Sequence, residues 1–520
     1  MMWKPTFLVA LSALFVGPST VLAYPPFREF PLQQKPAQPD CDRSRQRAEA
    51  VRDAFLFAWD GYYKYAFPND ELHPVDNGSG NSRNGWGASA VDALSTALIM
   101  ELPEVVDQIL DHIATIDYSQ TDTMVSLFET TIRYLGGMIS GYDLLKGPLS
   151  HLSSDSDKVE TLLTQSANLA NVMAFAFDTS SGVPYNILNI TDKTNDGSTT
   201  NGIATIGTLI LEWTRLSDLT GDDTYTTLVQ GGEKHLLQPQ PPEGEPFPGL
   251  IGHLVNIETG RIETSDISWG ASHDSFYEYL IKMYVYDPNR FREYRERWIA
   301  AAESSIKYLK STSRTASGKE LTYLAKYVGG EYRLESEHLA CFNGGNFILG
   351  GQVLHRPDLV DFGLKLVEGC YQTYHSTATR IGPETFGWDS ELVPDSQKDF
   401  FDENGFYIRN GFYNLRPEVI ESYYYAYRAT GNPKYQDWAW EAFVAINATT
   451  RTGSGFTAIY NVNDPDGGRK ANNQESFLFA EVLKYAYMIH VPDGDWNVAT
   501  DGRNKWVYNT EAHPIRVFER

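Results

Sequence analysis

The sequence predicts a single, all-helical domain. Helical periodicity recurs from about residue 45 almost to the end of the chain, the strand-like runs between helices are short, and no linker or shift in composition divides the chain. The 520 residues, 42% of them hydrophobic, are ample for a large core. Long helices in sequential pairs, with loops between them, are typical of an α/α barrel or toroid. A superhelical repeat array is the alternative, but the sequence has no fixed period of the kind such arrays show.

Two N-terminal segments precede this domain. Residues 1–23 have the pattern of a signal peptide, with a positive charge at Lys4, an apolar run at 7–16 and a small-residue cleavage site. A membrane anchor is the competing interpretation, but the apolar run is too short to span a bilayer. A Pro-rich leader follows at 24–45, and we expect the folded domain to comprise 46–520.

Apolar residues recurring every three to four positions define the predicted helices. A Gly/Asn/Ser-rich stretch, 77–87, is predicted to be a loop between the first two. The predicted helices are residues 48–59, 88–100, 105–116, 125–145, 158–175, 204–219, 225–237, 274–284, 291–309, 345–354, 359–373, 417–429, 436–448 and 476–490.

The net charge of -24 excludes two classes of partner. A strongly acidic surface repels phosphate backbones, so we expect no nucleic-acid binding. It also argues against a basic module that binds membrane surfaces. Because no later stretch reaches about 18 apolar residues, we expect the mature protein to be secreted, with no membrane association after signal removal.

The three cysteines fit an oxidising compartment. Two of them are expected to pair there, and Cys341 with Cys370 closes the shorter loop, which leaves Cys41 free. The cysteine and histidine spacings do not favour a zinc site. Three sequons, beginning at Asn77, Asn189 and Asn447, agree with a secretory route as N-glycosylation sites.

Acidic residues at helix starts are the most informative local feature. After Leu415-Arg416, Pro417 is well placed at the first position of a helix, and Glu418 and Glu421 then share one face of its opening turn. For an isolated helix, both acids would simply complement the macrodipole. Recurrence of the pattern weakens that interpretation.

The same arrangement appears in several other segments. Ser126 to Glu129 reads as a capping box that needs no further function. Asp274 and Glu278 lie on one face of another helix start. The remaining acids of this kind are Glu212 beside Trp213, Glu384 after Gly382-Pro383, and Glu475 with Glu481 further along.

In an α/α barrel these acids would meet at one mouth, because alternate helices run the same way. Crowded carboxylates there would raise some pKa values and provide an acid and a base. Neighbouring aromatics could pack against sugar rings, although each taken singly is more typical of the core. This combination favours a glycosidase. Residues 464–475 imitate an EF-hand but lack its turn glycine, and no Gly-x-Ser-x-Gly elbow exposes a serine.

In ordered blocks over residues 45–515, the sequence resembles glycoside hydrolase family 47, the class I α-1,2-mannosidases, and its secreted fungal branch in particular. His338-Leu-Ala-Cys-Phe and Trp440-Glu-Ala-Phe carry the fungal likeness. The matching blocks are Gly85-Trp-Gly-Ala-Ser-Ala-Val-Asp92, Val125-Ser-Leu-Phe-Glu129-Thr-Thr-Ile-Arg133, Asp274-Ser-Phe-Tyr-Glu278, Leu415-Arg416-Pro417-Glu418, Glu475-Ser-Phe477 and Asn509-Thr510-Glu511-Ala-His513-Pro514.

The resemblance implies an (α/α)7 barrel closed by a β-hairpin near the C-terminus. It implies an inverting enzyme, a monomer, that removes terminal α-1,2-linked mannose from high-mannose N-glycans. It also implies a Ca²⁺ deep in the barrel, held by Thr510 and otherwise by water. The sequence alone would make Asn509-Thr510-Glu511 an ordinary turn.

Site roles follow by motif. Glu129 is implied as general acid, Glu418 as general base, and Asp274 as a further essential carboxylate whose share of the work is open. The substrate-binding residues implied by the same blocks are Arg133, Glu212, Glu278, Glu384, Arg416, Glu421, Glu475 and the stacking aromatic Phe477.

The chain departs from the family pattern at three places. Ser95 replaces a second acid, Asn472-Asn473-Gln474 replaces a more acidic lead-in to Glu475, and Ser272-His273 stands where many members carry Arg or Gly. None removes an implied catalytic group. Two alternatives compete with the mannosidase: a lectin-like relative that binds mannose without cleaving it, and another α/α-barrel glycosidase or polysaccharide lyase.

Overall fold

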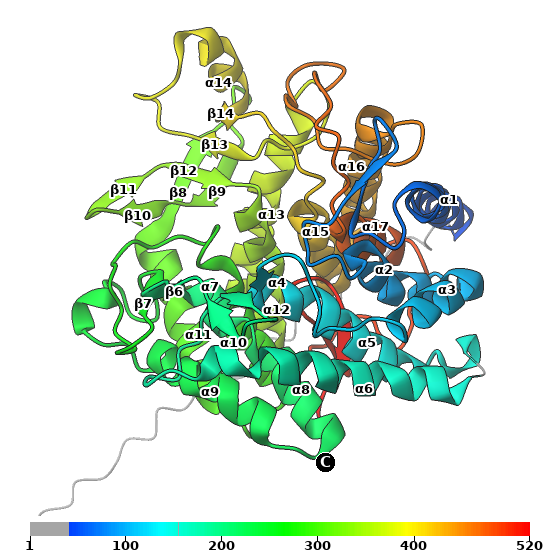
Figure 1. Ribbon diagram of the computed structural model, residues 1–520. Helices are drawn as coiled ribbons and strands as arrows, with labels where there is room; N and C mark the ends of the chain where they lie inside the picture. The colour runs from blue at the N-terminus through cyan, green and yellow to red at the C-terminus, as the bar shows by residue number, and fades with distance from the viewer. Residues whose placement is uncertain (1–40, 154, 520) are drawn as a thin grey trace, which may run out of the picture. The chain divides into compact units, whose positions relative to one another are not determined.

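The computed structural model describes residues 41–153 and 155–519, and helices dominate them (Figure 1). The predicted signal peptide and residues 24–40 of the predicted leader lie outside the described residues. The first helix begins at Cys41, inside the segment predicted to be leader. In the described part of the chain, no helix is both long and apolar enough to cross a membrane.

The helices agree with the predicted segments at most positions. They are α1 Cys41–Tyr65, α2 Ala88–Ile99, α3 Pro103–Ile113, α4 Leu127–Thr130, α5 Gly136–Leu145, α6 Ser156–Met173, α7 Ile203–Gly207, α8 Ile210–Thr220, α9 Thr224–Leu237, α10 Asp274–Tyr286, α11 Arg292–Ser304, α12 Asn343–Val353, α13 Pro357–His375, α14 Lys398–Asn404, α15 Glu418–Thr430, α16 Lys434–Thr450 and α17 Leu483–Met488.

Contacts between helices follow a regular order. Each of α2, α5, α8, α10, α12 and α15 packs on the helix that follows it in sequence, and α17 packs on α1. The same helices contact one another in turn, from α2 to α5, α8, α10, α12, α15 and α17, and α17 returns to α2. The inner members are buried almost all round: every residue of α2 is buried, as expected for helices with neighbours on all sides.

Several predicted helices are interrupted. The segment 125–145 begins as a short strand and α4, passes through a π-helical turn at Thr131–Leu135, and continues as α5. A second π-helical turn, Leu478–Val482, precedes α17. Such turns are often found at functional sites, and both of these follow a predicted site residue. The predicted helix 204–219 is likewise divided into α7 and α8.

The sequence did not predict α14. None of its seven residues is buried, so it has no apolar face that could produce helical periodicity. It lies beside the strands β13 and β14, at the top of Figure 1.

The strands are short, as predicted, and form small antiparallel sheets of two or three strands. They are β1 Glu71–His73, β2 Gly78–Gly80, β3 Val125–Ser126, β4 Ile187–Asn189, β5 Thr194–Asn195, β6 Thr200–Gly202, β7 Leu254–Asn256, β8 Lys310–Arg314, β9 Glu320–Leu324, β10 Lys326–Val328, β11 Glu331–Arg333, β12 Glu335–Glu337, β13 Thr385–Gly387, β14 Tyr407–Asn410, β15 Trp506–Tyr508 and β16 Pro514–Arg516.

Two of these strand groups matter for the site. The last hairpin pairs β15 with β16, and it contacts the inner helices α5 and α10. The sheet β12–β13–β14 covers a small second core, separate from the main one, that includes Tyr323, Phe386 and Trp388. The sheet β12–β13–β14 joins segments far apart in the sequence, and the hairpin brings the C-terminal part of the chain against α5 and α10.

The cysteines pair as predicted. Cys341 and Cys370 form a disulfide with a Cα–Cα distance of 6.0 Å, and it links the turn before α12 to α13. Cys41 is an exposed free thiol on the first residue of α1.

Candidate active site

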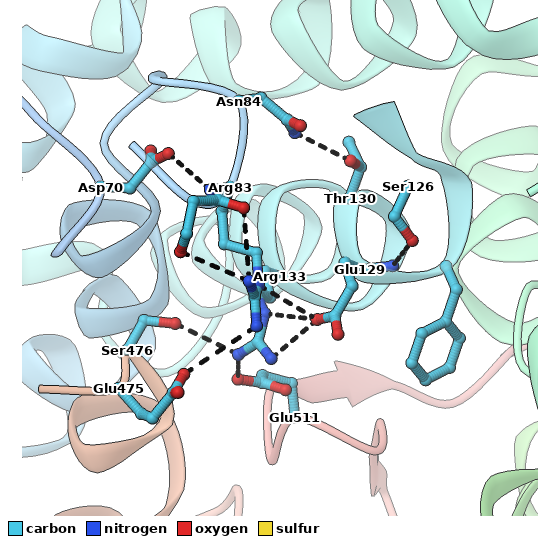
Figure 2. Close-up of polar contacts among 12 residues, drawn as sticks. Asp70, Arg83, Asn84, Ser126, Glu129, Thr130, Arg133, Glu475, Ser476 and Glu511 are labelled. Atoms are coloured by element: carbon cyan, nitrogen blue, oxygen red, sulfur yellow. Dashed lines mark hydrogen bonds and ion pairs between the residues drawn. The ribbon is translucent and has the colours of Figure 1, made fainter. Parts of the chain in front are cut away.

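A cavity of about 430 Å³ opens among the first turns of α4, α10 and α15. The hairpin turn between β15 and β16 and the stretch before α17 complete its wall. Its lining is rich in acids and contains three arginines, Arg83, Arg133 and Arg416, of which Figure 2 shows the first two.

The cavity brings together ten of the twelve residues assigned to catalysis, substrate binding or metal binding. They are Glu129, Arg133, Asp274, Glu278, Arg416, Glu418, Glu421, Glu475, Phe477 and Thr510. The other two, Glu212 and Glu384, stand behind lining residues.

Glu129 belongs to the first turn of α4, where it contacts two arginines. Ser126 caps the helix by accepting a hydrogen bond from the Glu129 backbone N–H at 3.3 Å, as the capping-box pattern predicts. The Glu129 carboxylate does not complete that box, because Oε2 accepts from Arg133 Nε at 2.9 Å and lies 3.6 Å from Arg83 Nε. Burial raises the pKa of Glu129, but Arg133 and Arg83 together bring it below its usual value.

Asp274 has no cation beside it. It is the first residue of α10, and its Oδ1 accepts from the Ser275 backbone N–H at 2.9 Å. Burial, together with the negative charges of Glu337, Glu278 and Glu418, raises the pKa of Asp274 to about 7. This carboxyl can therefore hold a proton near neutral pH.

Glu418 is the first residue of α15 and is paired with a histidine. Its Oε2 lies 2.6 Å from His338 Nδ1. Burial raises the pKa of Glu418, but the hydrogen bond and charge of His338 and the charge of Arg416 lower it below its usual value. At pH values between the two pKa values, Glu418 is therefore ionised while Asp274 still holds its proton.

Deeper acids crowd together with few cations. Glu278 forms an ion pair with Lys282, one turn further along α10. Burial and the charge of Glu278 raise the pKa of Glu421 to about 8. Burial, with the charges of neighbouring carboxylates, also raises the pKa of Glu481 and of Glu511 well above the usual range. A bound cation would relieve this repulsion.

Arg133 is the centre of a buried network (Figure 2). Besides Glu129, its guanidinium contacts Glu511 and donates to Ser476 Oγ at 3.1 Å. It also lies 5.6 Å from the ring centre of Phe477, close enough for a cation–π interaction. Arg133 thus connects α4, the residues just before the π-helical turn Leu478–Val482, and the last hairpin.

The turn that carries Thr510 is held from both sides. Asn509 Oδ1 accepts from the backbone N–H groups of Glu511 and His513, at 2.9 and 2.8 Å. Tyr279 Oη accepts from the Thr510 N–H at 3.2 Å.

Glu212 supports the same turn from behind. Its Oε1 accepts from Tyr279 Oη and Asn509 Nδ2, at 2.7 and 2.8 Å, while Oε2 has no hydrogen-bond partner among the described residues. Burial raises the pKa of Glu212 to about 8. Glu212 does not line the cavity, and Tyr279 and Asn509 connect it to the turn that carries Thr510.

Glu384 has a similar indirect place. Its two carboxylate oxygens accept from Arg416 Nε and Nη2 at 2.8 and 2.6 Å, and Arg416 lines the cavity. A bidentate pair of this kind fixes the plane of the guanidinium. At the rim, Glu475 Oε1 accepts from Asn414 Nδ2 at 3.1 Å and Asn473 Nδ2 at 2.9 Å.

The donor set around Thr510 fits a hard cation such as Ca²⁺. Thr510 and the acids Glu278, Glu421, Glu481 and Glu511 bring oxygen atoms, the ligands Ca²⁺ prefers, to the lining of one cavity, and crowding of these carboxylates leaves a need for positive charge there. In residues 41–153 and 155–519, no three His, Cys, Asp or Glu side chains are arranged to hold a metal directly.

Sequence reasoning missed Arg83 and Glu511 as cavity residues and His338 as the partner of Glu418, and it gave Glu481 no role beyond that of a helix-start acid. Glu481 and Glu511 stand inside matched blocks or beside them, so their acidity was the signal available. Arg83 comes from the Gly/Asn/Ser-rich loop, which carries no periodicity. No sequence signal pairs His338 with Glu418, 80 residues later.

The three departures from the family pattern have structural places. Ser95 Oγ contacts His513 Nδ1 and Lys484 Nζ, at 2.8 and 2.9 Å, below the cavity. Ser272 lines the cavity with a left-handed backbone at φ 75°, and Asn473 bonds Glu475.

Comparison with known proteins identifies the family in which this arrangement occurs. The family model described as "Glycosyl hydrolase family 47" matches residues 54–517. A mannosyl-oligosaccharide alpha-1,2-mannosidase of Coccidioides posadasii is 64% identical over 518 residues, which cover 99% of each chain. One of the same name from Penicillium citrinum is 60% identical over 474 residues, 91% of this chain and 92% of its own. Among solved structures, the alpha-1,2-mannosidase from Trichoderma reesei matches with a TM-score of 0.88 at 45% identity, covering 91% of this chain and 99% of that one.

Proposed function

The chain belongs to glycosyl hydrolase family 47, and on that premise we propose that it is a mannosyl-oligosaccharide α-1,2-mannosidase that removes terminal α-1,2-linked mannose from high-mannose N-glycans. The single observation that carries this proposal is the cavity itself, in which Asp274 and Glu418 have pKa values moved in opposite directions. Glycoside hydrolysis needs one protonated and one ionised carboxyl on the two sides of the scissile bond.

The acid and the base can be assigned on these grounds. Glu418, ionised and oriented by His338, is proposed as the general base that takes a proton from the attacking water. The resemblance implies Glu129 as the general acid. The electrostatics favour Asp274, because the two arginines keep Glu129 ionised while Asp274 has a pKa of about 7. We propose Asp274 as the group that delivers the proton to the leaving oxygen, with Glu129 ionised beside it.

We propose inversion as the stereochemical course. In an inverting glycosidase a water lies between the base and the anomeric carbon, so a base and not a nucleophile is needed on that side. Phe477 and the pair formed by Arg416 and Glu384 would position the sugar, the first by stacking and the second by hydrogen bonds to its hydroxyls.

We propose that Thr510 holds one Ca²⁺. When bound, the ion would supply a fixed positive charge that orients sugar hydroxyls and water. The acids Glu278, Glu421 and Glu481 would receive hydrogen bonds from its waters. The residues of this chain then do the remaining work: Asn509 and Tyr279 hold the Thr510 turn, and Glu212 holds both.

The finer features of fold and cell biology are proposals too. The order of helix contacts supports an (α/α)7 barrel closed by the hairpin β15–β16. A secreted, monomeric glycoprotein agrees with the acidic surface and the disulfide. Of the three sequon asparagines, Asn77 is exposed in the β1–β2 turn, while Asn189 and Asn447 are half-buried, so Asn77 is the favoured attachment site.

One experiment tests the function and its stereochemistry together. The protein is incubated with a high-mannose glycan, loss of hexose is followed by mass spectrometry, and the first sugar released is observed by NMR. We expect stepwise loss of α-1,2-linked mannose, released as β-mannose. Binding without loss of hexose would indicate a lectin-like protein, and initial release of α-mannose would refute inversion.

A further inference from the structure

The strand β12 ends at Glu337, and the next residue is His338; these two consecutive polar residues contact two different segments of the cavity wall. Glu337 Oε1 accepts a hydrogen bond from the Ala271 backbone N–H, and its Oε2 lies 2.7 Å from Lys326 Nζ. His338 Nδ1 lies 2.6 Å from Glu418 Oε2, and its Nε2 lies 2.7 Å from Tyr374 Oη. Neither residue lines the cavity, so both act through other residues.

Glu337 holds the loop that carries Asp274. The Gly270 carbonyl accepts from the backbone N–H groups of His273 and Asp274, at 3.1 and 3.0 Å, so the loop is one compact turn. That turn packs directly on the Glu337 carboxylate: a Cβ atom on Gly270 would come within 1.9 Å of Glu337 Oε1. The placement of Asp274 therefore depends on Glu337.

His338 holds Glu418. Its side chain is 1% exposed, and both ring nitrogens have partners, which leaves the ring a single orientation. Because ionised Glu418 only accepts hydrogen bonds, Nδ1 carries the proton and donates to it. The Tyr374 hydroxyl contacts the other ring nitrogen, Nε2, so the ring is held from both sides.

We propose that Glu337 and His338 are a positioning pair, through which one strand end sets the relative placement and the protonation of Asp274 and Glu418. The inference rests on the proposed function and adds to it two residues that do not touch substrate. The adjacency of the two residues is what makes the pair effective, since a shift of one moves the other. The His338 backbone N–H also donates to the Glu384 carbonyl at 2.9 Å, which anchors this strand end to the segment that orients Arg416.

The charges around Asp274 and Glu418 determine how the loss of Glu337 or His338 should change the pKa of each carboxyl. Asp274 is faced by Glu337, Glu278 and Glu418, whose negative charges raise its pKa. Glu337 is in turn faced by Lys326 and by His273.

Glu418 is faced by His338 and Arg416, which lower its pKa, and by the hydroxyls of Tyr374 and Tyr413. The pair thus moves the two pKa values apart. Losing Glu337 should narrow the active pH range from the alkaline side, and losing His338 should narrow it from the acid side.

The test compares the pH profiles of kcat and kcat/KM for four variants on an α-1,2-linked mannose disaccharide. Glu337→Gln keeps a hydrogen-bond acceptor for Ala271 and removes the charge. His338→Ala removes the donor to Glu418, whereas His338→Asn restores an N–H near the position of Nδ1. Glu335→Gln is the matched control, because Glu335 lies on the same strand and pairs with Arg409 instead.

We expect the alkaline limb to move down by about 0.5 pH unit in Glu337→Gln, because a nearby negative charge is lost. We expect the acid limb to move up by about one pH unit in His338→Ala, with kcat reduced roughly tenfold or more, because a hydrogen bond to the ionised form is lost. His338→Asn should recover much of this loss, and Glu335→Gln should match the parent protein.

Melting temperatures identify any variant that fails to fold. If His338→Ala does not fold, the milder substitutions Glu337→Gln and His338→Asn provide the test. Folded variants whose two limbs stay at the parent values would overturn the proposal, even if kcat fell, since a purely structural role does not move a limb. If the parent protein itself does not cleave the disaccharide or a high-mannose glycan, the proposed function fails instead. The two failures are therefore distinct.

Discussion

The two sides of the cavity shift the pKa of a half-buried carboxylate in opposite directions. On the α4 side, Glu129 lies beside Arg133 and Arg83, and its pKa falls below the usual value. On the α10 side, Asp274 is surrounded by other acids, and its pKa rises to about 7. Both residues stand in the first turn of a helix, so the helix macrodipole acts on both alike. The difference teaches that neighbouring charges, and not helix position or burial, decide which carboxyl keeps its proton.

The largest effects should follow from removing the working carboxyls of the α10 and α15 sides. Asp274→Asn and Glu418→Gln should each lower kcat by about 10²–10⁴-fold or more, the usual share of general acid–base catalysis. The amides are nearly isosteric, so the melting temperature should change little. Steady-state kinetics with an exposed control, Asp111→Asn, measures this; activity within a few-fold of the parent would contradict the assignment.

The pH dependence of activity shows which of the two sides supplies the general acid. An acid must be protonated to work, so activity should fall as pH rises through about 7, where Asp274 loses its proton. This alkaline limb should persist in the residual activity of Glu129→Gln and disappear in that of Asp274→Asn. If it disappears in Glu129→Gln instead, Glu129 is the acid, as the resemblance implies.

Bound calcium should stabilise the deeper, acid-rich part of the cavity, which adjoins both sides. Because a ligand bound only by the folded protein stabilises it by mass action, chelation should lower the melting temperature and reduce activity. Thr510→Ala should abolish the difference between calcium-loaded and chelated protein without preventing folding. Thermal unfolding with and without added Ca²⁺ checks this, and an unchanged melting temperature and full activity after exhaustive chelation would refute the metal assignment.

The smallest expected effect follows from removing a cation on the α4 side, which makes the surroundings of Glu129 more like those of Asp274. Arg83→Met removes a cation 3.6 Å from Glu129 and should raise the pKa of Glu129. The guanidinium is partly exposed and Arg133 remains, so the change should be only about 0.5 pH unit. If Glu129 works in its ionised form, the acid limb moves up; movement of the alkaline limb would instead identify Glu129 as the acid. Arg45→Met, on the exposed face of α1, is the control.

Much of the fold could be predicted from the sequence because it depends on local pattern. Apolar periodicity predicted nearly every helix, and the shorter loop identified the Cys341–Cys370 pair. Prediction from periodicity failed where the local pattern is weak. The helix α14 buries no residue. The predicted helix 125–145 contains a strand, and also a π-helical turn whose hydrogen bonds leave the apolar spacing almost unchanged.

The sequence by itself determined which acids are candidates for catalysis, because carboxylates at helix starts and the matching blocks are local features. Only the tertiary structure decided which of these carboxyls hold a proton and which are ionised. Glu212 and Glu384 became supports rather than contacts, Arg83 and Glu511 joined the cavity, and His338 found Glu418 across 80 residues. The physical reason is that the energy of a charge depends on its burial and on distances of a few ångströms to other charges. Those distances join segments that the chain itself keeps far apart.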